Sequence, residues 1–418
     1  MAIPVVAQGS KIGMHAIRPN QVIPLVRQAH TRGVVWPLVK AVDNGGIAID
    51  VKSIEPKTMT IVRFVDLQED AAQDVVHWTA ADMRAHARRA LDFVWLRLNA
   101  QERAAADWIE PINEADPPGV DGWRAFGQYL SIIVDEGNQR GMKLALPAFN
   151  AGTPEWAEAQ ALVGTGLFAA LKAGGHILTV HEGVFGAQPV DNGFGDLIPG
   201  SPVVPGAGSL CFRYRYLYSL LAARDEVVPL VISEFYAGGS YQLTPAEQVA
   251  RFAWYDRLAR QDPFVLAVLP FTIDPDDTWR NSDYTYAYGA VLNYLAAERD
   301  KPNNAPPAPA PVPDPIPVPV PIPNPAPIPA PEPPVPADPG PAPQPVRVGT
   351  HRVTAIKLNI REFPWVGAAV PPLVGTLEQG AVITVLGVYQ PANLATGWGC
   401  IAADGNQWVS MQWVVALS

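Results

Sequence analysis

Two glutamates stand at the ends of short apolar runs that lie far apart in the chain. Glu114 closes "ADWIEPINE", and Glu234 lies in "PLVISEFYAG". Charged side chains are rare inside strands, so we expect each glutamate to stand where a strand leaves the core. Two facing carboxylates can hydrolyse a glycosidic bond: one protonates the leaving oxygen, and the other attacks the anomeric carbon or activates water. This chemistry requires a fold that brings the two residues together.

The first 300 residues alternate between β-rich runs and amphipathic helical segments. The eight runs are "KIGMHAI", "VVWPLVKAVD", "TMTIVRFVD", "ADWIEPINE", "MKLALPAFN", "HILTVHEG", "PLVISEFYAG" and "VLAVLPFTID". Helix starts are recognisable at Thr79 with Asp82, and at Thr244 with Pro245 and Glu247. Strands followed by helices indicate a parallel sheet, and eight such units predict an α/β fold of the (β/α)8 TIM-barrel type. A doubly wound open sheet is the competing prediction. The connection after the second run is short, so we expect little helix in "DNGGIAIDVKSIEP".

Polar residues end most of these runs, as expected for a pocket at the C-terminal mouth of a barrel. The set is His15, Asp43, Asp66, Asn113 and Glu114, Asn150, His181 and Glu182, Glu234, and Asp274. The fourth and seventh strands of a barrel are not neighbours, so Glu114 and Glu234 would face each other across the mouth. A retaining mechanism predicts about 5–5.5 Å between their carboxyl groups.

These features resemble the large clan of retaining glycoside hydrolases that carry catalytic glutamates on strands four and seven, with family 39-like and family 5-like members. Asn113-Glu114 matches the clan's asparagine–acid/base pair, and "EPINE" is similar to the strand-four signature of family 39-like members. The resemblance implies that Glu114 is the acid/base, that Glu234 is the nucleophile and that Asn113 donates a hydrogen bond to the sugar 2-hydroxyl. It covers the whole barrel in architecture and two short motifs in detail.

The sequence departs from the clan's pattern on strands six and eight. In "VHEGVF", His181 matches a His-x-Tyr motif loosely, but Gly183 stands at the tyrosine position. The usual strand-eight tryptophan is missing from "PFTIDP", and Trp279 follows a few residues later. Clan members commonly place an arginine near the nucleophile, and Arg63 on the third run is the candidate for it.

Further candidate substrate-binding residues follow the strand ends. Aromatic loop residues either stack on sugar rings or simply pack, and we keep both interpretations. The candidates are Asn150, Trp156, Phe185, Tyr236 and Trp279. We expect Glu110 to be a structural charge that pairs with Arg63 or Arg97 rather than a second catalytic acid, and Glu182 to point outward.

Composition excludes several other classes of function. The net charge of −10 and the pI of about 5.2 argue against a nucleic-acid partner, which would require a basic face. No apolar run approaches the roughly 20 residues that span a bilayer. The chain has no His-Glu-x-x-His, no cysteine pair at metal spacing, no calcium loop, no glycine-rich phosphate loop and no Gly-x-Ser-x-Gly. We therefore predict a carbohydrate substrate without a cofactor or metal.

A proline-rich segment separates this region from a smaller one. Between Pro302 and Pro345 about half of the residues are proline, which favours extended polyproline II and prevents a packed core. We interpret the segment as a semi-rigid spacer; a docking site for a proline-recognising partner is the alternative.

The C-terminal segments "IKLNIREFP", "VGTLEQGAVITVLGVY" and "GWGCIAADGNQWVS" predict short strands with glycine turns, hence a small all-β barrel. They resemble a bacterial SH3-like domain. The resemblance implies attachment to cell-wall peptide or another envelope ligand, with Tyr389 and Trp398 as candidate contacts. A structural or protein-docking module with core tryptophans is the alternative.

The sequence thus predicts three parts: a TIM-barrel glycoside hydrolase-like domain (1–300), a proline-rich linker (301–347) and an SH3-like domain (348–418). We expect a retaining glycoside hydrolase tethered to an envelope- or wall-binding module. One alternative is a peptidoglycan-degrading, endolysin-like enzyme, and another is a barrel that only binds glycans. Its expected location is extracellular or at the cell envelope, although "MAIPVVAQGSKIG" lacks the features of a signal peptide.

Overall fold

The computed structural model describes residues 8–65, 69–186, 188–238, 243–275 and 277–303, and the strand segments between residues 349 and 416. The chain divides into two compact units, Met1–Val312 and Pro313–Ser418, and each is described by itself. Residues 304–348, which include most of the expected linker, lie outside the described residues, as does Asp66. The three-part division of the chain stays a prediction.

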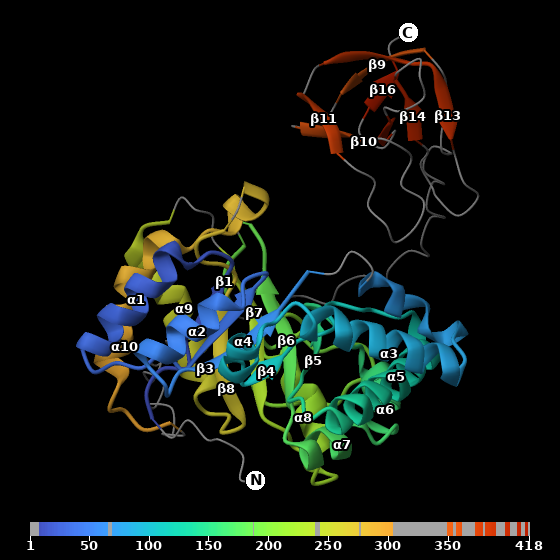
Figure 1. The fold of residues 1–418 in the computed structure, drawn as a ribbon. Coiled ribbons are helices and arrows are strands. Elements are labelled where there is room, and N and C mark those ends of the chain that lie inside the picture. Colours follow the sequence, from blue (N-terminus) through green and yellow to red (C-terminus); the bar gives the residue numbers. More distant parts are fainter. Residues whose placement is uncertain are drawn as a thin grey trace, which may run out of the picture. The chain divides into compact units, whose positions relative to one another are not determined.

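The first unit is built on eight strands that follow the eight runs of the sequence in order (Figure 1). They are β1 (Met14–Ala16), β2 (Leu38–Val42), β3 (Met59–Arg63), β4 (Trp108–Ile109), β5 (Ala145–Phe149), β6 (Ile177–Val184), β7 (Leu230–Ala237) and β8 (Val265–Pro270). All neighbouring strands run parallel, in the orders β1-β2-β3-β4 and β5-β6-β7-β8. Parallel bridges Ile109↔Leu144 and Ile12↔Val268 join the two sheets at both seams. The fold is therefore an α/β fold of the TIM-barrel type.

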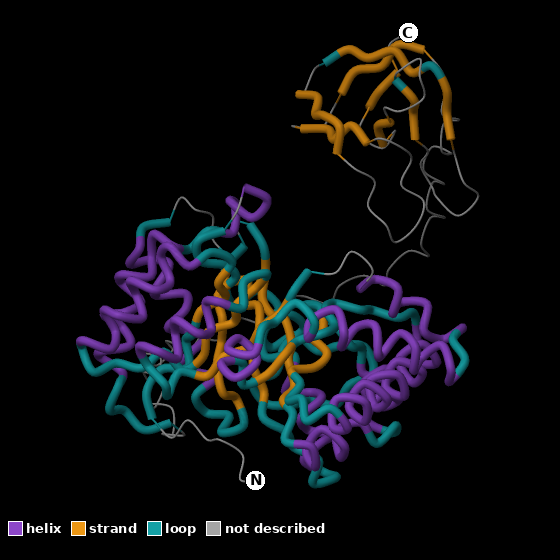
Figure 2. The backbone as a smooth tube through the Cα atoms, in the orientation of Figure 1, coloured by secondary structure: helices purple, strands orange, loops and turns teal. Residues whose placement is uncertain are grey.

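Helices alternate with the strands and lie outside them (Figure 2). They are α1 (Pro19–Thr31), α2 (Gly46–Ile54), α3 (Ala80–Trp95), α4 (Ala100–Ala105), α5 (Gly119–Gln139), α6 (Trp156–Val163), α7 (Leu167–Gly174), α8 (Tyr214–Ala222), α9 (Pro245–Ala259) and α10 (Tyr288–Glu298), with 3₁₀ turns η1 (Glu69–His77), η2 (Asp277–Ser282) and η3 (Thr285–Ala287). The capping boxes expected at Thr79 and Thr244 are present and begin α3 and α9. The expectation of little helix after β2 is wrong. α2 forms there because Ile47, Ala48 and Val51 recur on one face and are buried.

A layer of apolar side chains fills the barrel between the strands. Its members come from β2, β3, β5, β6, β7 and β8: Leu38, Ile61, Ala145, Ile177, Val231, Leu266, Ala267 and Leu269. These residues are fully buried, as expected for a packed barrel interior rather than a pore. A larger apolar cluster packs the outer faces of the strands against the helices.

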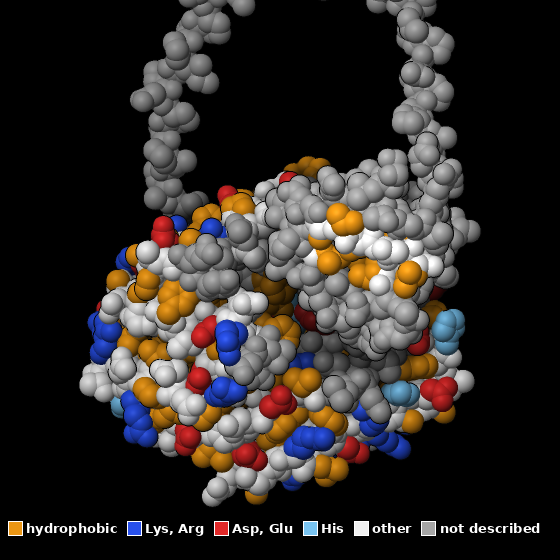
Figure 3. Space-filling model, turned by 90° about the horizontal axis from the view of Figure 1, so that it is seen from above, with side chains coloured by type: hydrophobic (Ala, Val, Ile, Leu, Met, Phe, Trp, Pro, Cys, Tyr) orange, Lys and Arg blue, Asp and Glu red, His pale blue; other side chains and the backbone are white. Residues whose placement is uncertain are grey.

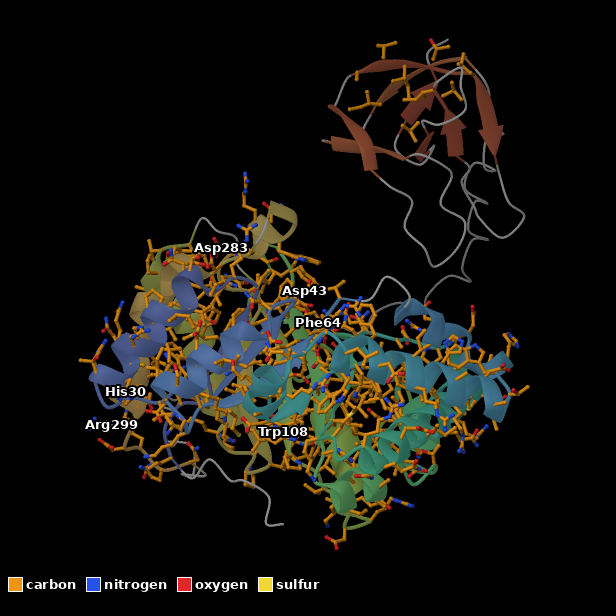
Figure 4. The ribbon with its side chains drawn as sticks, in the orientation of Figure 1. His30, Asp43, Phe64, Trp108, Asp283 and Arg299 are labelled. Atoms are coloured by element: carbon orange, nitrogen blue, oxygen red, sulfur yellow. The ribbon has the colours of Figure 1, made fainter. Side chains whose placement is uncertain are left out.

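The two ends of the barrel differ in what they present. Figure 4 places Asp43 and Phe64, which follow β2 and β3, at one end, and Trp108, which begins β4, at the other. The first end is the C-terminal mouth, where the polar strand-end residues lie. On the face drawn in Figure 3 the visible acidic and basic side chains are interspersed.

The described part of the second unit consists of short antiparallel strands. The pairing orders are β11-β10-β15-β14-β13 and β12-β9-β16. The strands are β9 (Gly349–Val353), β10 (Lys357–Arg361), β11 (Leu373–Glu378), β12 (Val382–Val385), β13 (Gly387–Tyr389), β14 (Trp398–Cys400), β15 (Trp408–Ser410) and β16 (Val414–Ala416). The SH3-like assignment stays a prediction, since the side chains of Tyr389 and Trp398 are outside what the structure describes. Across the described residues, no helix is long and apolar enough to cross a membrane.

Candidate active site

Glu234, on β7, lies at the centre of a buried polar cluster at the mouth of the barrel. Tyr236 Oη donates to its Oε2 at 2.7 Å. Its Oε1 lies 3.2 Å from Lys40 Nζ, 3.4 Å from His15 Nε2 and 3.6 Å from His181 Nε2. Burial alone would raise the pKa of Glu234, but His181, Lys40 and His15 next to it together hold it well below its usual 4.5. The site therefore keeps this carboxylate ionised.

Lys40 is the cation that the sequence analysis did not identify. It lies within β2, is fully buried, and its Nζ is 2.5 Å from Glu110 Oε1 as well as 3.2 Å from Glu234. Arg63 Nε is 3.8 Å from the same Glu110 oxygen. Glu110 thus has the structural pairing expected of it with Arg63, and its shorter ion pair is with Lys40. A single lysine among apolar strand residues is not a motif, so the sequence did not reveal this role. The one hint was that a buried cation is rarely left without an anionic partner.

Glu114 is the more accessible of the two predicted catalytic carboxylates. Its side chain is 34% exposed, against 7% for Glu234. It follows the short strand β4, and its backbone N–H still bonds Ala148 O at 2.9 Å, which ties the segment to β5. Its backbone has φ = 49°, in the left-handed region. Its Oε1 lies 2.7 Å from Nδ1 of His181, on β6.

His181 brings the two carboxylates into one group. One oxygen each from Glu114 and Glu234 and one His181 nitrogen all lie within 4.8 Å of one another. Such a set could also offer ligands to a divalent cation, a grouping that the sequence motifs did not predict. Against this, the Lys40 ammonium already lies 3.2 Å from the same Glu234 carboxylate. A metal bound here would stand next to a buried positive charge.

Tyr236 was expected as a stacking surface, but its environment suits a different role. The side chain is only 5% exposed, and its hydroxyl donates to Glu234. Burial is the largest cause that raises the pKa of Tyr236, so the phenol stays a donor. Gly183 is the register partner of Tyr236 and has φ = 104°. A Cβ at Gly183 would lie 2.1 Å from Tyr236 O, so the close pairing of β6 with β7 at this point requires glycine.

Four aromatic rings form a continuous line beside Glu234. Phe185 lies 3.9 Å from Tyr236, Tyr236 lies 5.4 Å from Phe271, and Phe271 lies 5.0 Å from Trp279, measured between ring centroids. Phe271 follows β8 at the position where the sequence analysis found no tryptophan, and it also packs against His15 at 4.7 Å. The inner rings are buried, whereas Phe185 is 58% and Trp279 44% exposed.

The remaining candidates lie at different distances from this cluster. Asn113 is 9% exposed, and its Oδ1 is buried without a hydrogen-bond partner among the described residues. The Asn150 carbonyl accepts from Thr153, and Trp156 packs against Ile198, Ala207 and Tyr216. Across the described contacts, neither Asn150 nor Trp156 touches Glu114 or Glu234.

Glu182, next to His181 on β6, points away from the mouth into the helical layer. It accepts hydrogen bonds from Phe212 N (2.6 Å), Tyr214 N (2.9 Å) and Tyr255 Oη (2.5 Å). Burial raises its pKa to about 7. It anchors α8 and α9 to the barrel and takes no part in the carboxylate cluster.

No protein-family model matches the sequence, and a search of curated proteins gives no match. The solved structures that match in a structure search include a β-1,4-D-mannanase from Cryptopygus antarcticus, with a TM-score of 0.36 and 10% identity over 69% of this chain and 94% of that one. A GH18 chitinase from Cycas revoluta in complex with (GlcNAc)4 has a TM-score of 0.32 and 11% identity over 69% and 98%. An L-ribulose 3-epimerase has a TM-score of 0.30 and 12% identity over 69% and 96%. At these identities and scores, activity must be argued from the site itself.

Proposed function

We propose that the first unit hydrolyses glycosidic bonds with retention of configuration, with Glu234 as nucleophile and Glu114 as acid/base. The observation that carries the proposal is the approach of the two carboxylates at the barrel mouth, where one oxygen of each lies within 4.8 Å of the other. Retaining enzymes hold their carboxyl groups about 5–5.5 Å apart, whereas inverting enzymes leave about 6.5–9.5 Å for a water molecule. The spacing therefore favours direct attack by Glu234.

The environments of the two glutamates suit different halves of this reaction. Glu234 is ionised and held by Tyr236, Lys40 and His15, so its carboxylate can attack the anomeric carbon and form a glycosyl ester. Glu114 is more exposed, so it can meet the leaving-group oxygen and protonate it as the bond breaks. It then removes a proton from the water that hydrolyses the ester.

His181 can accompany Glu114 through both proton transfers. An imidazole Nδ1 accepts from a protonated carboxyl in one tautomer and donates to a carboxylate in the other. The 2.7 Å contact between His181 and Glu114 suits either state. Asn113, which precedes Glu114 in the chain, is proposed to donate a hydrogen bond from its amide nitrogen to the sugar 2-hydroxyl.

The finer assignments belong to the same proposal. The strand-four segment and the Asn113-Glu114 pair support a family 39-like or family 5-like enzyme. The small all-β unit is proposed to be an SH3-like module that binds the cell wall or another envelope ligand, with the protein acting outside the cell or at its envelope. A glycan of peptidoglycan is the alternative substrate.

The test uses the full chain with a panel of aryl glycosides. Glu234→Gln should abolish turnover on every substrate, because no covalent intermediate can form. Glu114→Ala should still form the intermediate from substrates with good leaving groups, and azide should rescue its turnover because a small anion attacks without a general base. Equal losses without rescue would contradict the separate roles.

Each assay is repeated after dialysis against EDTA. Undiminished turnover is expected, because the proposed steps use only side chains. A loss that Mn²⁺ or Zn²⁺ restores would show that Glu114, His181 and Glu234 hold a catalytic metal instead. Glycan binding without turnover would make the barrel a binding scaffold.

A further inference from the structure

The line of rings beside Glu234 ends on two exposed side chains that lie on either side of β7. Phe185 follows β6 and Trp279 lies in the loop after β8, while β6 and β8 are the two strands that pair with β7. Between them, Tyr236 bonds Glu234, and Phe271 packs on His15, which lies 3.4 Å from Glu234. The two exposed rings thus flank the nucleophile.

The exposure of these two rings contrasts with that of the rings they touch. Phe185 and Trp279 are 58% and 44% exposed, whereas Tyr236 and Phe271 are each 5% exposed. The buried pair serves the carboxylate and fixes the positions of its exposed neighbours. Large exposed aromatic side chains at a polar mouth are available to a ligand that has both apolar faces and hydroxyl groups.

The geometry points to a binding surface for a glycan chain, one sugar ring resting on Phe185 and another on Trp279, so that the bond between them is presented to Glu234 and Glu114. The inference rests on the proposed glycosidase activity and adds to it the substrate class. A chain that stacks on both rings has sugars on both sides of the scissile bond. The preferred substrate is therefore an oligosaccharide or polysaccharide rather than a glycoside of a single sugar.

A monosaccharide would use this surface differently. The rings are connected through two intervening side chains, with centroid steps of 3.9, 5.4 and 5.0 Å, and the outer two follow strands on either side of β7. We therefore expect one sugar positioned at Glu234 to reach at most one exposed ring. Short aryl glycosides should therefore gain little from the outer rings, and longer chains should gain from both. Chain-length dependence is the property to measure.

The experiment compares Phe185→Ala, Trp279→Ala and Trp279→Phe with a control, Phe194→Ala. Phe194 is a 36% exposed phenylalanine that packs on Phe212 and Trp254, away from this line of rings. Binding is measured by calorimetry in a Glu234→Gln background, with β-1,4-linked gluco-, manno-, xylo- and chito-oligosaccharides of one to six units. Turnover of the same series is measured in the otherwise unchanged protein.

Each alanine variant is expected to weaken binding of the best hexasaccharide about three- to tenfold, since one aromatic contact contributes about 0.5–1.5 kcal/mol. Binding of the monosaccharide should be unchanged, Trp279→Phe should restore most of the loss, and Phe194→Ala should behave like the parent. Equal losses on one-unit and six-unit ligands, no loss in either alanine variant, or no oligosaccharide bound by the parent would each overturn the inference.

The two readouts separate this inference from the proposed function. If glycan chains bind in a way that depends on the two rings but the unchanged protein shows no turnover, the binding surface is supported and the hydrolase activity is contradicted. If the protein turns over aryl glycosides and oligosaccharides equally well with and without the two rings, the hydrolase activity is supported and the binding surface is contradicted.

Discussion

Three buried charges, Glu110, Lys40 and Glu234, form one chain of ion pairs beneath the mouth of the barrel. Lys40 Nζ lies 2.5 Å from Glu110 and 3.2 Å from Glu234, with almost no exposure of any of the three. Lys40 balances the charge of one of the two glutamates, so the other leaves a net negative charge. Arg63, 3.8 Å from Glu110, helps to balance it. Glu110 thus supports a cation that in turn supports the nucleophile.

Replacing Lys40 by Met tests this arrangement. The substitution removes the cation beside Glu234, so the pKa of Glu234 should rise. A nucleophile is active when ionised, and activity is lost as pH falls through its pKa. The acid limb of the kcat/KM profile should therefore move to higher pH.

The controls separate this effect from a general loss of packing. Lys52→Met, which breaks a partly exposed pair with Asp107, should leave the acid limb in place. Adding Glu110→Gln to Lys40→Met should lower the shift, because the carboxylate then left next to Glu234 is removed. A Lys40→Met profile that superimposes on the parent would show that Lys40 does not act on Glu234.

At this scale the sequence predicts which polar residues gather at the mouth better than it predicts their contacts. Glu114, Glu234 and His181 were proposed because a polar side chain at the end of an apolar run is unexpected; in the structure only Glu114 follows its strand, whereas Glu234 and His181 lie within β7 and β6. Lys40 and His15 were not assigned roles, because their importance comes from contacts across the barrel that chain order does not reveal. Tyr236 was found, but its partner was not, since only the local strand geometry turns its hydroxyl toward Glu234.

At the scale of elements, the pairing of β6 with β7 shapes the site. Their register shifts between Val180 and His181, after which His181 pairs with Glu234 and Gly183 with Tyr236. The eight strands and their order could be predicted from the alternation of runs and helices. This irregularity could not, because it depends on how two strands distant in sequence fit at the mouth.

Gly183→Ala should disturb this pairing severely. The new Cβ would lie 2.1 Å from Tyr236 O at a φ of 104°, so β7 or the Tyr236 side chain must shift. We expect a loss of about 2–4 kcal/mol in the free energy of unfolding and a fall in kcat/KM as the bond to Glu234 is lost. Denaturant titration and steady-state kinetics measure the two effects.

Gly186→Ala is the matched control. Gly186 also has positive φ, at 66°, but a Cβ there meets nothing within 4 Å. The free energy of unfolding of this variant should fall by only about 1–2 kcal/mol, because alanine disfavours a left-handed backbone, and its activity should be unchanged. If the two variants are equally impaired, close packing of β6 on β7 is not what requires Gly183.

Glu182 provides a second test at this scale, through the pH dependence of stability. Its pKa of about 7 in the folded chain lies above the ordinary 4.5 of the unfolded chain. Between these values the folded protein holds a proton that the unfolded one releases, so this contribution to stability is complete below about pH 4.5 and falls as pH rises to 7. The decline should amount to about 3 kcal/mol at most.

Glu182→Gln removes the titration while retaining a polar side chain. Whatever its absolute stability, the variant should lack this part of the decline when unfolding free energies are compared between pH 4.5 and 7.5. Parallel curves for the parent and the variant would show that the folded protein holds Glu182 ionised through its bonds to Phe212, Tyr214 and Tyr255.

At the scale of the whole molecule, composition divides the chain more clearly than any motif. In the sequence, the proline-rich stretch from Pro302 to Pro345 follows the residues that form the barrel and precedes those that form the short antiparallel strands. Proline content alone predicts a segment that cannot form a core of its own. Sequence could not specify what the smaller unit binds, because several unrelated functions occur on small β-barrels.

The proline-rich segment, if it is a spacer, determines how far apart the two units lie in solution. A polyproline II segment rises about 3.1 Å per residue, so 44 residues could reach on the order of 130 Å when extended. We expect the two units to tumble semi-independently, with small-angle scattering giving a maximum dimension well above that of the isolated barrel. Replacing residues 302–345 by an equally long Gly/Ser segment should shorten the mean separation, because such a chain is a flexible coil. If the parent and the Gly/Ser variant give the same compact scattering profile, the two units dock on each other and the segment is not a spacer. Its proline content would then have another role, such as binding a proline-recognising partner.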